Sequence, residues 1–148
     1  MQIEANIDDM DPRLWPYVID QLLGAGALDA WATPMLMKKG RPAFTLGVLC
    51  EADDAEELRA LIFRETTTIG VRYFEVERQI LERTIDHVDV SGQSVAVKRS
   101  SVASDQVVNT SIEWDDVVAA AQALGLSAKD VLAAAVAAAR TNGPTLSD

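Results

Sequence analysis

Hydrophobic and polar residues alternate in short stretches along the first half of the chain. Ile3, Ala5 and Ile7, for example, alternate with polar residues, which is the pattern of a strand with one buried face. Four strands are expected in this half, and turn-forming residues separate them. They cover residues 2–8, 27–37, 43–50 and 71–82.

Two helices are expected between these strands. The first begins at Asp11 and Pro12, because Asp is a favoured N-cap residue and Pro loses no hydrogen bond at the first helical position. It ends at Gly24. The second follows the aspartates at positions 53 and 54, repeats apolar residues at helical spacing, and ends at three consecutive threonines.

The order strand, helix, strand, strand, helix, strand predicts an α+β fold, the ferredoxin-like split βαβ sandwich. We expect this core in residues 1–82, and a β-hairpin with a helical appendage in residues 83–148. The apolar faces of the appendage can pack on its own sheet or against a neighbouring subunit. Its expected elements are a hairpin over residues 85–98, a short strand over 107–112, and helices over 114–124 and 128–140.

The ferredoxin-like topology brings distant polar stretches together. Its first and second strands run parallel, and its third and fourth strands run against them. The end of the first strand, the hairpin between the second and third, and the segment before the fourth then lie at one end of the sheet. The sequence therefore predicts one polar site built from three segments. These segments hold Asp8 and Asp9, then Lys38, Lys39 and Arg41, then residues 64–72.

The acidic residues at this end are candidate metal ligands. Glu4, Asn6 and Asp8 lie on one face of the first strand, about 7 Å apart at each step, and Asp9 follows them. Carboxylate and amide oxygens suit Mg²⁺ or Mn²⁺ better than a soft metal. A solvated polar strand face would show the same residues.

The basic and hydroxyl residues at this end are candidate anion ligands, because guanidinium, ammonium, hydroxyl and turn N–H groups all donate to phosphate oxygens. The alternatives are a solvated hairpin tip and a helix that ends because threonines are poor helix formers, with Gly70 permitting the turn. The candidates are Lys38, Lys39, Arg41, Arg64, Thr66, Thr67, Thr68 and Arg72, with Lys98 as a further cation.

The composition narrows the classes of function. The 148 residues include 23 acidic and 13 basic ones, and the formal net charge of −10 argues against nucleic acid as a partner. The only cysteine, Cys50, lies in an apolar run, so we expect a buried thiol rather than a nucleophile. The only histidine is His87, so no zinc-type cluster is expected. We expect no membrane span, no signal peptide and a cytoplasmic location.

Three stretches of the sequence resemble the signature motifs of a known family. They are residues 4–10 (EANIDDM), 37–42 (MKKGRP) and 64–72 (RETTTIGVR), and their order and spacing match as well. The resemblance continues from Lys98 to residues 113–116 (EWDD). The chain is in this respect similar to the C-terminal portion of the nickel insertion proteins of the nickel-pincer nucleotide pathway.

The resemblance implies part of a CTP-dependent cyclometallase. Such an enzyme inserts nickel, its substrate metal, into pyridinium-3,5-bisthiocarboxylic acid mononucleotide and so completes the cofactor of lactate racemase. In that family the C-terminal portion binds CTP with Mg²⁺ or Mn²⁺, and CTP is hydrolysed to CMP and pyrophosphate. The family's N-terminal half, with its histidine-rich tract, is not in this chain, so we expect it as a partner. We also expect a homo-oligomer, a trimer or a hexamer.

The family motifs imply three sets of site residues when they are carried onto this sequence. Ala5 departs from the motif, where a threonine is expected, and so does Ile112, where a proline is expected. The implied nucleotide ligands are Lys38, Lys39, Arg41, Arg64, Thr66, Thr67, Thr68 and Arg72; the metal ligands are Glu4, Asp8 and Asp9; the catalytic residues are Asp8, Asp9 and Glu65.

A second hypothesis keeps the fold and changes the function. A ferredoxin-like module without catalysis can sense a small anion through the same cations and hold an oligomer together. The two hypotheses differ in whether the carboxylates take part in chemistry.

Overall fold

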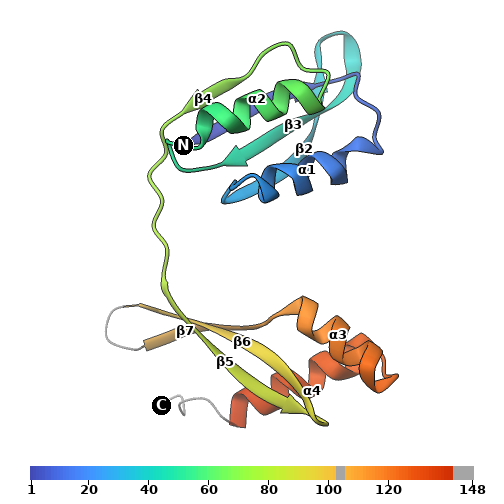
Figure 1. Ribbon diagram of the computed structural model, residues 1–148, viewed down its shortest axis with the longest axis vertical. Coiled ribbons are helices and arrows are strands. Elements are labelled where there is room, and N and C mark those ends of the chain that lie inside the picture. Colours follow the sequence, from blue (N-terminus) through green and yellow to red (C-terminus); the bar gives the residue numbers. More distant parts are fainter. Residues whose placement is uncertain (103–105, 142–148) are drawn as a thin grey trace. The chain divides into compact units, whose positions relative to one another are not determined.

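The computed structural model describes residues 1–102 and 106–141. The chain divides into two compact units, Met1–Arg78 and Gln79–Asp148 (Figure 1). Each unit is built on an antiparallel sheet that carries two helices, and each has its own hydrophobic core.

The N-terminal unit has the predicted ferredoxin-like topology. Its four strands lie in the order β2-β3-β1-β4, and every neighbouring pair is antiparallel. The two crossover connections each contain one helix. The elements are β1 (Gln2–Ile7), α1 (Leu14–Gly24), β2 (Asp29–Met37), the 3₁₀ turn η1 (Lys38–Gly40), β3 (Arg41–Leu49), α2 (Ala55–Glu65) and β4 (Arg72–Phe74).

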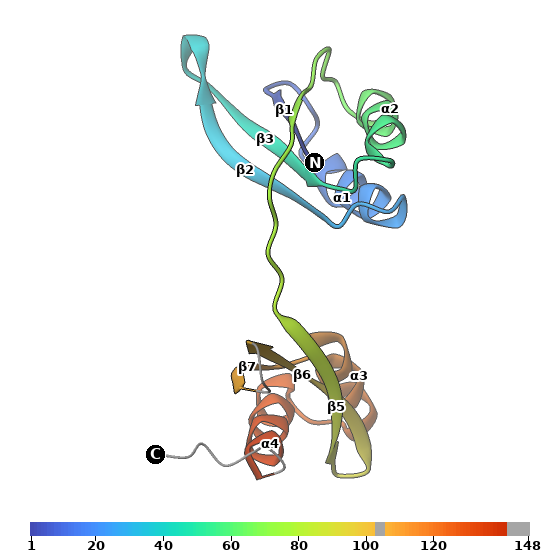
Figure 2. The same cartoon turned by 90° about the vertical axis from the view of Figure 1, so that its left-hand side faces the viewer.

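Both helices of this unit cover the same face of the sheet, and the β2–β3 hairpin extends beyond them (Figure 2). The alternation in β1 directs Ile3 and Ile7 into the core, where Ile3 is fully buried together with Leu22 of α1 and Leu58 of α2. The opposite face of β1 carries polar side chains. Burial on one face of each strand therefore fixes which residues remain on the other face.

The fourth strand is much shorter than predicted. The pattern indicated a strand over residues 71–82, but β4 ends at Phe74. Its partner β1 is only six residues long. Pairing with β4 is limited to Gln2–Glu4 of that strand, and Gln2 lies opposite Phe74. A strand needs ladder partners for its N–H and C=O groups, and beyond Phe74 no strand of this unit lies opposite.

Helix α1 begins at Leu14, three residues after the predicted N-cap. Asp11 still acts at this end, because its Oδ1 accepts a hydrogen bond of 2.9 Å from the backbone N–H of Arg13. The Arg13 side chain, and then this backbone N–H, hold the pKa of the Asp11 carboxyl below its usual value. Helix α2 follows Asp54 as predicted.

The C-terminal unit is a three-stranded sheet in the order β5-β6-β7 with both helices packed on it. Val95 and Val97 of β6 are fully buried, as are Val117 of α3 and Ala135 of α4. The predicted helices therefore pack on their own sheet, which is the first of the two alternatives given for their apolar faces. The elements are β5 (Glu82–Val90), β6 (Gln93–Val102), β7 (Gln106–Ile112), α3 (Trp114–Leu124) and α4 (Ala128–Thr141).

Within the described residues, no single helix is long and apolar enough to cross a membrane. Only α3 and α4 taken together reach that length and composition, and the chain bends by 117° between them.

Candidate functional site

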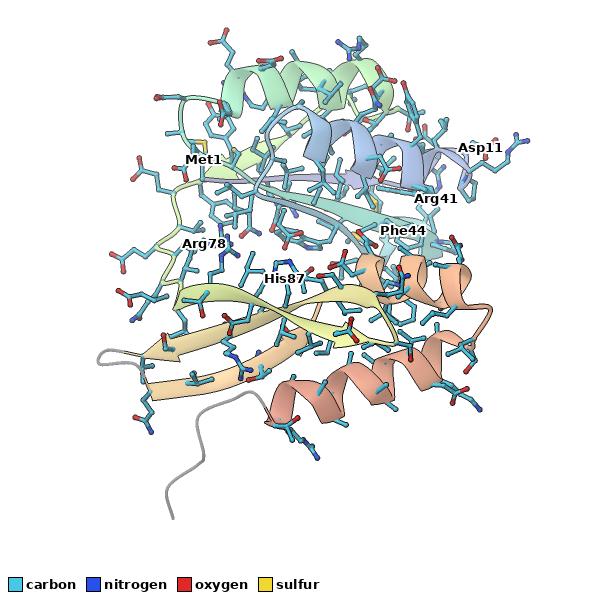
Figure 3. The ribbon with its side chains drawn as sticks, turned by 60° about the horizontal axis from the view of Figure 1, so that its bottom comes forward. Met1, Asp11, Arg41, Phe44, Arg78 and His87 are labelled. Atoms are coloured by element: carbon cyan, nitrogen blue, oxygen red, sulfur yellow. The ribbon has the colours of Figure 1, made fainter. Side chains whose placement is uncertain are left out.

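Three segments meet at one end of the N-terminal sheet. They are the exit of β1, the tip of the β2–β3 hairpin, and the loop between α2 and β4. Arg41 and Asp11 lie at this end of the unit, and Met1 lies at the opposite end (Figure 3). This convergence was predicted from the topology alone, and side-chain contacts between the segments confirm it.

Three side-chain pairs join the segments, and each pair contains one acidic residue. Nε of Arg72 donates to Oε2 of Glu4 at 2.8 Å, and the guanidinium of Arg41 donates to Oδ2 of Asp8 at 3.0 Å. The hydroxyl of Thr67 donates to Oδ1 of Asp9 at 2.5 Å. The residues of these pairs are 33 to 68 positions apart in the sequence. Each acidic residue of the β1 segment is thus held by a donor from another segment.

The two arginines of these pairs are more exposed than the carboxylates they bind. The side chains of Arg41 and Arg72 are 59% and 52% exposed, whereas those of Asp8 and Glu4 are 23% and 20% exposed. Both guanidiniums therefore keep N–H groups directed to solvent. A ligand can reach the cations of this site more easily than the carboxylates.

Asn6 links these pairs to the centre of the sheet. Its Oδ1 accepts hydrogen bonds from the hydroxyl of Thr45 and from Nη2 of Arg72, both at 3.1 Å. Arg72 therefore bridges Glu4 and Asn6 on the same strand face. Sequence reasoning placed Asn6 among the oxygen donors but missed Thr45. The register of β1 with β3, in which Asn6 lies opposite Thr45, is the signal that would have found it.

The hairpin tip presents two lysines on a tightly turned backbone. Lys39 and Gly40 both have positive φ, 63° and 70°. A left-handed conformation is unfavourable for a residue with a Cβ. Among the described residues, neither Lys38 nor Lys39 forms a salt bridge. The tip therefore carries two lysines without a salt bridge in the turn that precedes Arg41.

The threonine stretch divides its hydroxyls between structure and site. Thr66 Oγ1 donates to the backbone oxygen of Ile62 at 2.8 Å. Thr66 therefore acts at the end of α2, in agreement with the alternative that the threonines serve to end the helix. Thr68 Oγ1 donates to the backbone oxygen of Gly70 at 2.9 Å, which shapes the loop. Gly70 itself does not use a positive φ. Only Thr67 points its hydroxyl at a carboxylate of another segment.

Arg64 and Glu65 are not brought into contact with the other two segments. Nε of Arg64 donates to Oε1 of Glu65 at 2.8 Å, and both belong to the last turn of α2. Arg64 also lines a hollow of about 400 Å³ between α1 and α2, together with Gln21 and Glu57. Lys98 lies in the C-terminal unit, where it forms a salt bridge of 2.5 Å with Glu113.

The carboxylates of the site form no ready-made cage for a metal ion. Within the described residues, no group of three or more His, Cys, Asp and Glu side chains is positioned to hold one. Glu4, Asp8 and Asp9 are oxygen donors of the type that Mg²⁺ and Mn²⁺ prefer, and Mg²⁺ is commonly bound by one or two carboxylates together with substrate phosphates. The donor set therefore fits a cation that arrives with a phosphate ligand.

The only cysteine of the chain lies in the core of the N-terminal unit, away from this end. Cys50 is 1% exposed, and burial, the main cause, raises the pKa of its thiol. This confirms the predicted buried thiol. Its backbone pairs with Met1, at the end of the unit opposite Arg41. His87 lies on β5 of the C-terminal unit and is exposed.

Comparison with known proteins identifies the family. The family described as nickel insertion protein matches residues 1–132. The chain belongs to this family. This confirms the resemblance that the three sequence motifs indicated.

Two relatives show how much of a family member this chain covers. The pyridinium-3,5-bisthiocarboxylic acid mononucleotide nickel insertion protein of Nocardioides sp. is 54% identical over 93% of this chain, which corresponds to 35% of that relative. A putative nickel insertion protein of Myxococcus xanthus is 45% identical over 92% of this chain and 35% of the relative. The chain thus spans about a third of the length of these curated relatives.

A solved structure covers nearly the same extent as this chain. It is the apo form of the C-terminal domain of a cyclometallase involved in the synthesis of the NPN cofactor of lactate racemase. It superimposes with a TM-score of 0.84 and 40% identity, covering 93% of this chain and 94% of that one. A protein from Methanopyrus kandleri follows with a TM-score of 0.63 and 26% identity, covering 96% of this chain and 86% of that one.

Proposed function

We propose that this chain is the nucleotide-binding and nucleotide-hydrolysing C-terminal part of a nickel insertion enzyme that completes the nickel-pincer nucleotide cofactor of lactate racemase. The observation that carries the proposal is the meeting of the three family motifs through the pairs Arg72–Glu4, Arg41–Asp8 and Thr67–Asp9. Cations, hydroxyls and hard oxygen donors gathered at one surface suit a metal-bound polyphosphate.

In this proposal the basic residues bind the triphosphate of CTP. Lys38 and Lys39 act as point charges, while the guanidiniums of Arg41 and Arg72 offer planar forks that match phosphate oxygens. Thr66, Thr67 and Thr68 supply hydroxyl and loop N–H donors. Arg64 is bonded to Glu65 and contacts neither of the other two segments, so we expect its contribution to be the smallest of the basic set.

The acidic residues hold Mg²⁺ or Mn²⁺ against the phosphates and assist cleavage. Glu4, Asp8 and Asp9 are the proposed metal ligands, and Asp8, Asp9 and Glu65 are the proposed acid–base residues. A divalent cation bound there would neutralise charge that develops on the phosphate oxygens. The products of this cleavage would be CMP and pyrophosphate.

The remaining substrates and partners belong to the whole enzyme. Nickel is the substrate metal, and pyridinium-3,5-bisthiocarboxylic acid mononucleotide is the organic substrate named for a relative. Nickel usually takes imidazole or thiolate ligands in proteins, and the buried Cys50 and His87 make a poor pair for it. We propose that the N-terminal half of the enzyme supplies what is missing, within a cytoplasmic homo-oligomer, a trimer or a hexamer.

One observation favours the second function, a module that senses a small anion without catalysis. No three carboxylates are gathered for a metal in the described residues, and the acidic residues of the site are already paired with protein donors. Such a module would bind a polyphosphate through Lys38 and Lys39 and leave it intact.

A turnover assay distinguishes the two functions. The chain is incubated with Mn²⁺ and each of CTP, UTP, ATP and GTP, and the monophosphate is measured by chromatography. We expect CMP and pyrophosphate from CTP. Binding of CTP without any release of CMP would favour the anion-sensing module, and no binding of any nucleotide would contradict both.

A second assay tests what the chain does alone. It is incubated with the apo pincer nucleotide, CTP, Mn²⁺ and Ni²⁺, and the product is measured by mass spectrometry. We expect nickel insertion only when the N-terminal half of a family member is added. Nickelated product without that half would show that these residues are a complete cyclometallase and that the sulfurs of the pincer nucleotide capture nickel directly.

A further inference from the structure

The face of the N-terminal sheet opposite the helices carries an aromatic ring that the proposed function does not use. Leu46 and Val48 of β3 are fully buried in the core, so Gly47 between them points to the other face of the sheet. Trp31 of β2 lies opposite Gly47 in the register and shares this face. Both helices of the unit cover the core side (Figure 2). The side chain of Trp31 is half-buried.

The indole of Trp31 lies face-on against the backbone of Gly47. A Cβ built on Gly47 would lie 2.5 Å from Cζ2 and 2.7 Å from Nε1 of the indole, and closer still to Cε2. Cε2 is bonded to both of the other atoms, so an atom that approached the edge of the ring would meet those two first. The space for a Cβ is therefore taken by the face of the ring. Glycine at this position lets the indole lie flat on the sheet.

The second face of the indole is consequently directed away from the sheet. The face of an aromatic ring carries partial negative charge, and Trp attracts cations more strongly than Tyr or Phe does. Two charged side chains belong to the same row of residues across the sheet. Glu4 of β1 lies opposite Gly47, and Arg72 of β4 lies opposite Glu4. This row offers an aromatic face, a carboxylate and a guanidinium.

The indole and the guanidinium are close enough to contact one small ligand. The indole lies over β3, while the guanidinium of Arg72 lies over β1, where it bonds Glu4 and Asn6. Adjacent strands of a sheet are about 4.8 Å apart. A ring stacked on the indole therefore brings an acid group on its edge within reach of Arg72, whose side chain is half exposed.

We propose that Trp31 is the stacking platform for the pyridinium ring of the organic substrate. This inference rests on the proposed function, in which the substrate is the pyridinium mononucleotide with two acid groups that is named for a relative. The indole face and Glu4 attract the cationic ring, and Arg72 attracts an acid group on it. A neutral base such as cytosine gains the stacking but not the cation–π attraction. The row therefore selects a charged ring.

The test uses nicotinic acid mononucleotide, a pyridinium mononucleotide with one ring carboxylate, as the probe. Binding is followed by saturable quenching of tryptophan fluorescence and by the charge-transfer absorbance of a stacked indole–pyridinium pair. Trp31→Leu removes the aromatic face but keeps an apolar side chain. We expect this variant to lose the absorbance and to bind the probe roughly 3- to 30-fold more weakly, the range of a cation–π contact. Trp31→Phe should have an intermediate affinity.

Three controls isolate the stacking. Trp114→Leu is the matched variant, because Trp114 is 55% exposed but belongs to the C-terminal unit, and it should keep both the absorbance and the affinity. Gly47→Ala keeps Trp31 but fills the space beneath its ring, so it should weaken the probe as well. It also tests the inference should Trp31→Leu not fold. CMP, which has a phosphate and a neutral base, should lose less affinity than the probe in Trp31→Leu.

Three results would overturn the inference. They are an unchanged affinity for the probe in both Trp31→Leu and Gly47→Ala, equal losses of affinity for CMP and for the probe in Trp31→Leu, and no saturable binding of the probe to the wild-type chain. Failure of the proposed function is measured separately with CTP. A wild-type chain that binds no CTP contradicts that function, whereas a chain that binds and cleaves CTP but does not bind the probe contradicts only the role of Trp31.

Discussion

The two units of the chain use charged side chains in different ways. In the C-terminal unit, Arg99 is only 8% exposed, and it bonds Asp86 of β5 and the backbone oxygen of Ala139 near the end of α4. In the N-terminal unit, Arg41 and Arg72 are more than half exposed and bind carboxylates at one end of the sheet. The comparison teaches that burial separates a cation that joins a helix to a sheet from cations that are open to a ligand.

Removal of Arg99 should have the largest effect, and the effect should be on stability. In Arg99→Ala the buried carbonyl of Ala139 loses its donor, at about 1 to 3 kcal/mol, and the aliphatic part of the side chain no longer packs. We expect the C-terminal unit to lose about 2 to 4 kcal/mol in its free energy of unfolding, measured by urea denaturation.

Arg99→Met is the control for packing, because it keeps an unbranched apolar side chain and removes only the donors. Its loss should be smaller than that of the alanine variant. Affinity for CTP should be the same in both variants under conditions in which they remain folded. Equal stability of Arg99→Ala and wild type would show that this buried arginine is not a structural link.

Replacement of Arg72 should reverse this pattern. Arg72→Ala should weaken binding of CTP by about 1.5 to 3 kcal/mol, the value of a charge-assisted hydrogen bond, which is roughly a 10- to 150-fold change in Kd. The free energy of unfolding should change by less than about 1 kcal/mol, because half-exposed ion pairs contribute little. Calorimetry and urea denaturation measure the two quantities.

Arg72→Lys tests whether the planar fork matters. Lysine keeps the charge but cannot bridge Glu4 and Asn6 as the guanidinium does. We expect an affinity between those of wild type and Arg72→Ala. A strongly destabilised Arg72→Ala with normal affinity would place Arg72 with Arg99 as a structural cation and remove the contrast between the units.

The sequence predicted the fold of the N-terminal unit and the meeting of its polar segments, but not the individual pairs. Alternation in β1 and the order of elements are sufficient for the ferredoxin-like topology. That Thr67 rather than Thr66 reaches Asp9 depends on how α2 ends, where the hydroxyl of Thr66 bonds the carbonyl of Ile62. That detail is set by side-chain rotamers, which hydrophobic patterns do not specify.

The separate hydrophobic core of the C-terminal unit was not predicted, for a related reason. Short apolar runs such as those of β6 predict a strand without saying what covers it. The structure packs Val95 and Val97 against the small apolar side chains of α3 and α4, so the predicted appendage has a core of its own. The third strand was predicted, but its pairing with β6 required the register that places Ile112 opposite Val97.

The hairpin tip offers a smaller effect in which stability and binding change in opposite directions. Lys39 has a φ of 63°, which costs a residue with a Cβ about 1 kcal/mol relative to glycine. Lys39→Gly should therefore stabilise the N-terminal unit by about 0.5 to 1 kcal/mol while it weakens CTP binding severalfold. Lys39→Ala removes the same charge but keeps the backbone cost. Equal unfolding free energies for these two variants would show that the turn carries no such cost.

The smallest expected effect concerns Cys50, at the end of the N-terminal unit away from the site. Burial raises the pKa of its thiol in the folded chain, whereas an exposed cysteine in the unfolded chain has a pKa of about 8.5. Below pH 8.5 the thiol is protonated in both states, so its contribution to stability is fully present. As the pH rises further, only the unfolded state releases the proton, and the stability falls until the folded pKa is reached. Urea denaturation at pH 7.5 and pH 10 should therefore show a slightly larger decline in the free energy of unfolding for the wild type than for Cys50→Ala. An equal decline in both proteins would mean that Cys50 titrates in the folded chain as it does in the unfolded one. The thiol would then be accessible to solvent, which would contradict its burial in the core of the N-terminal unit.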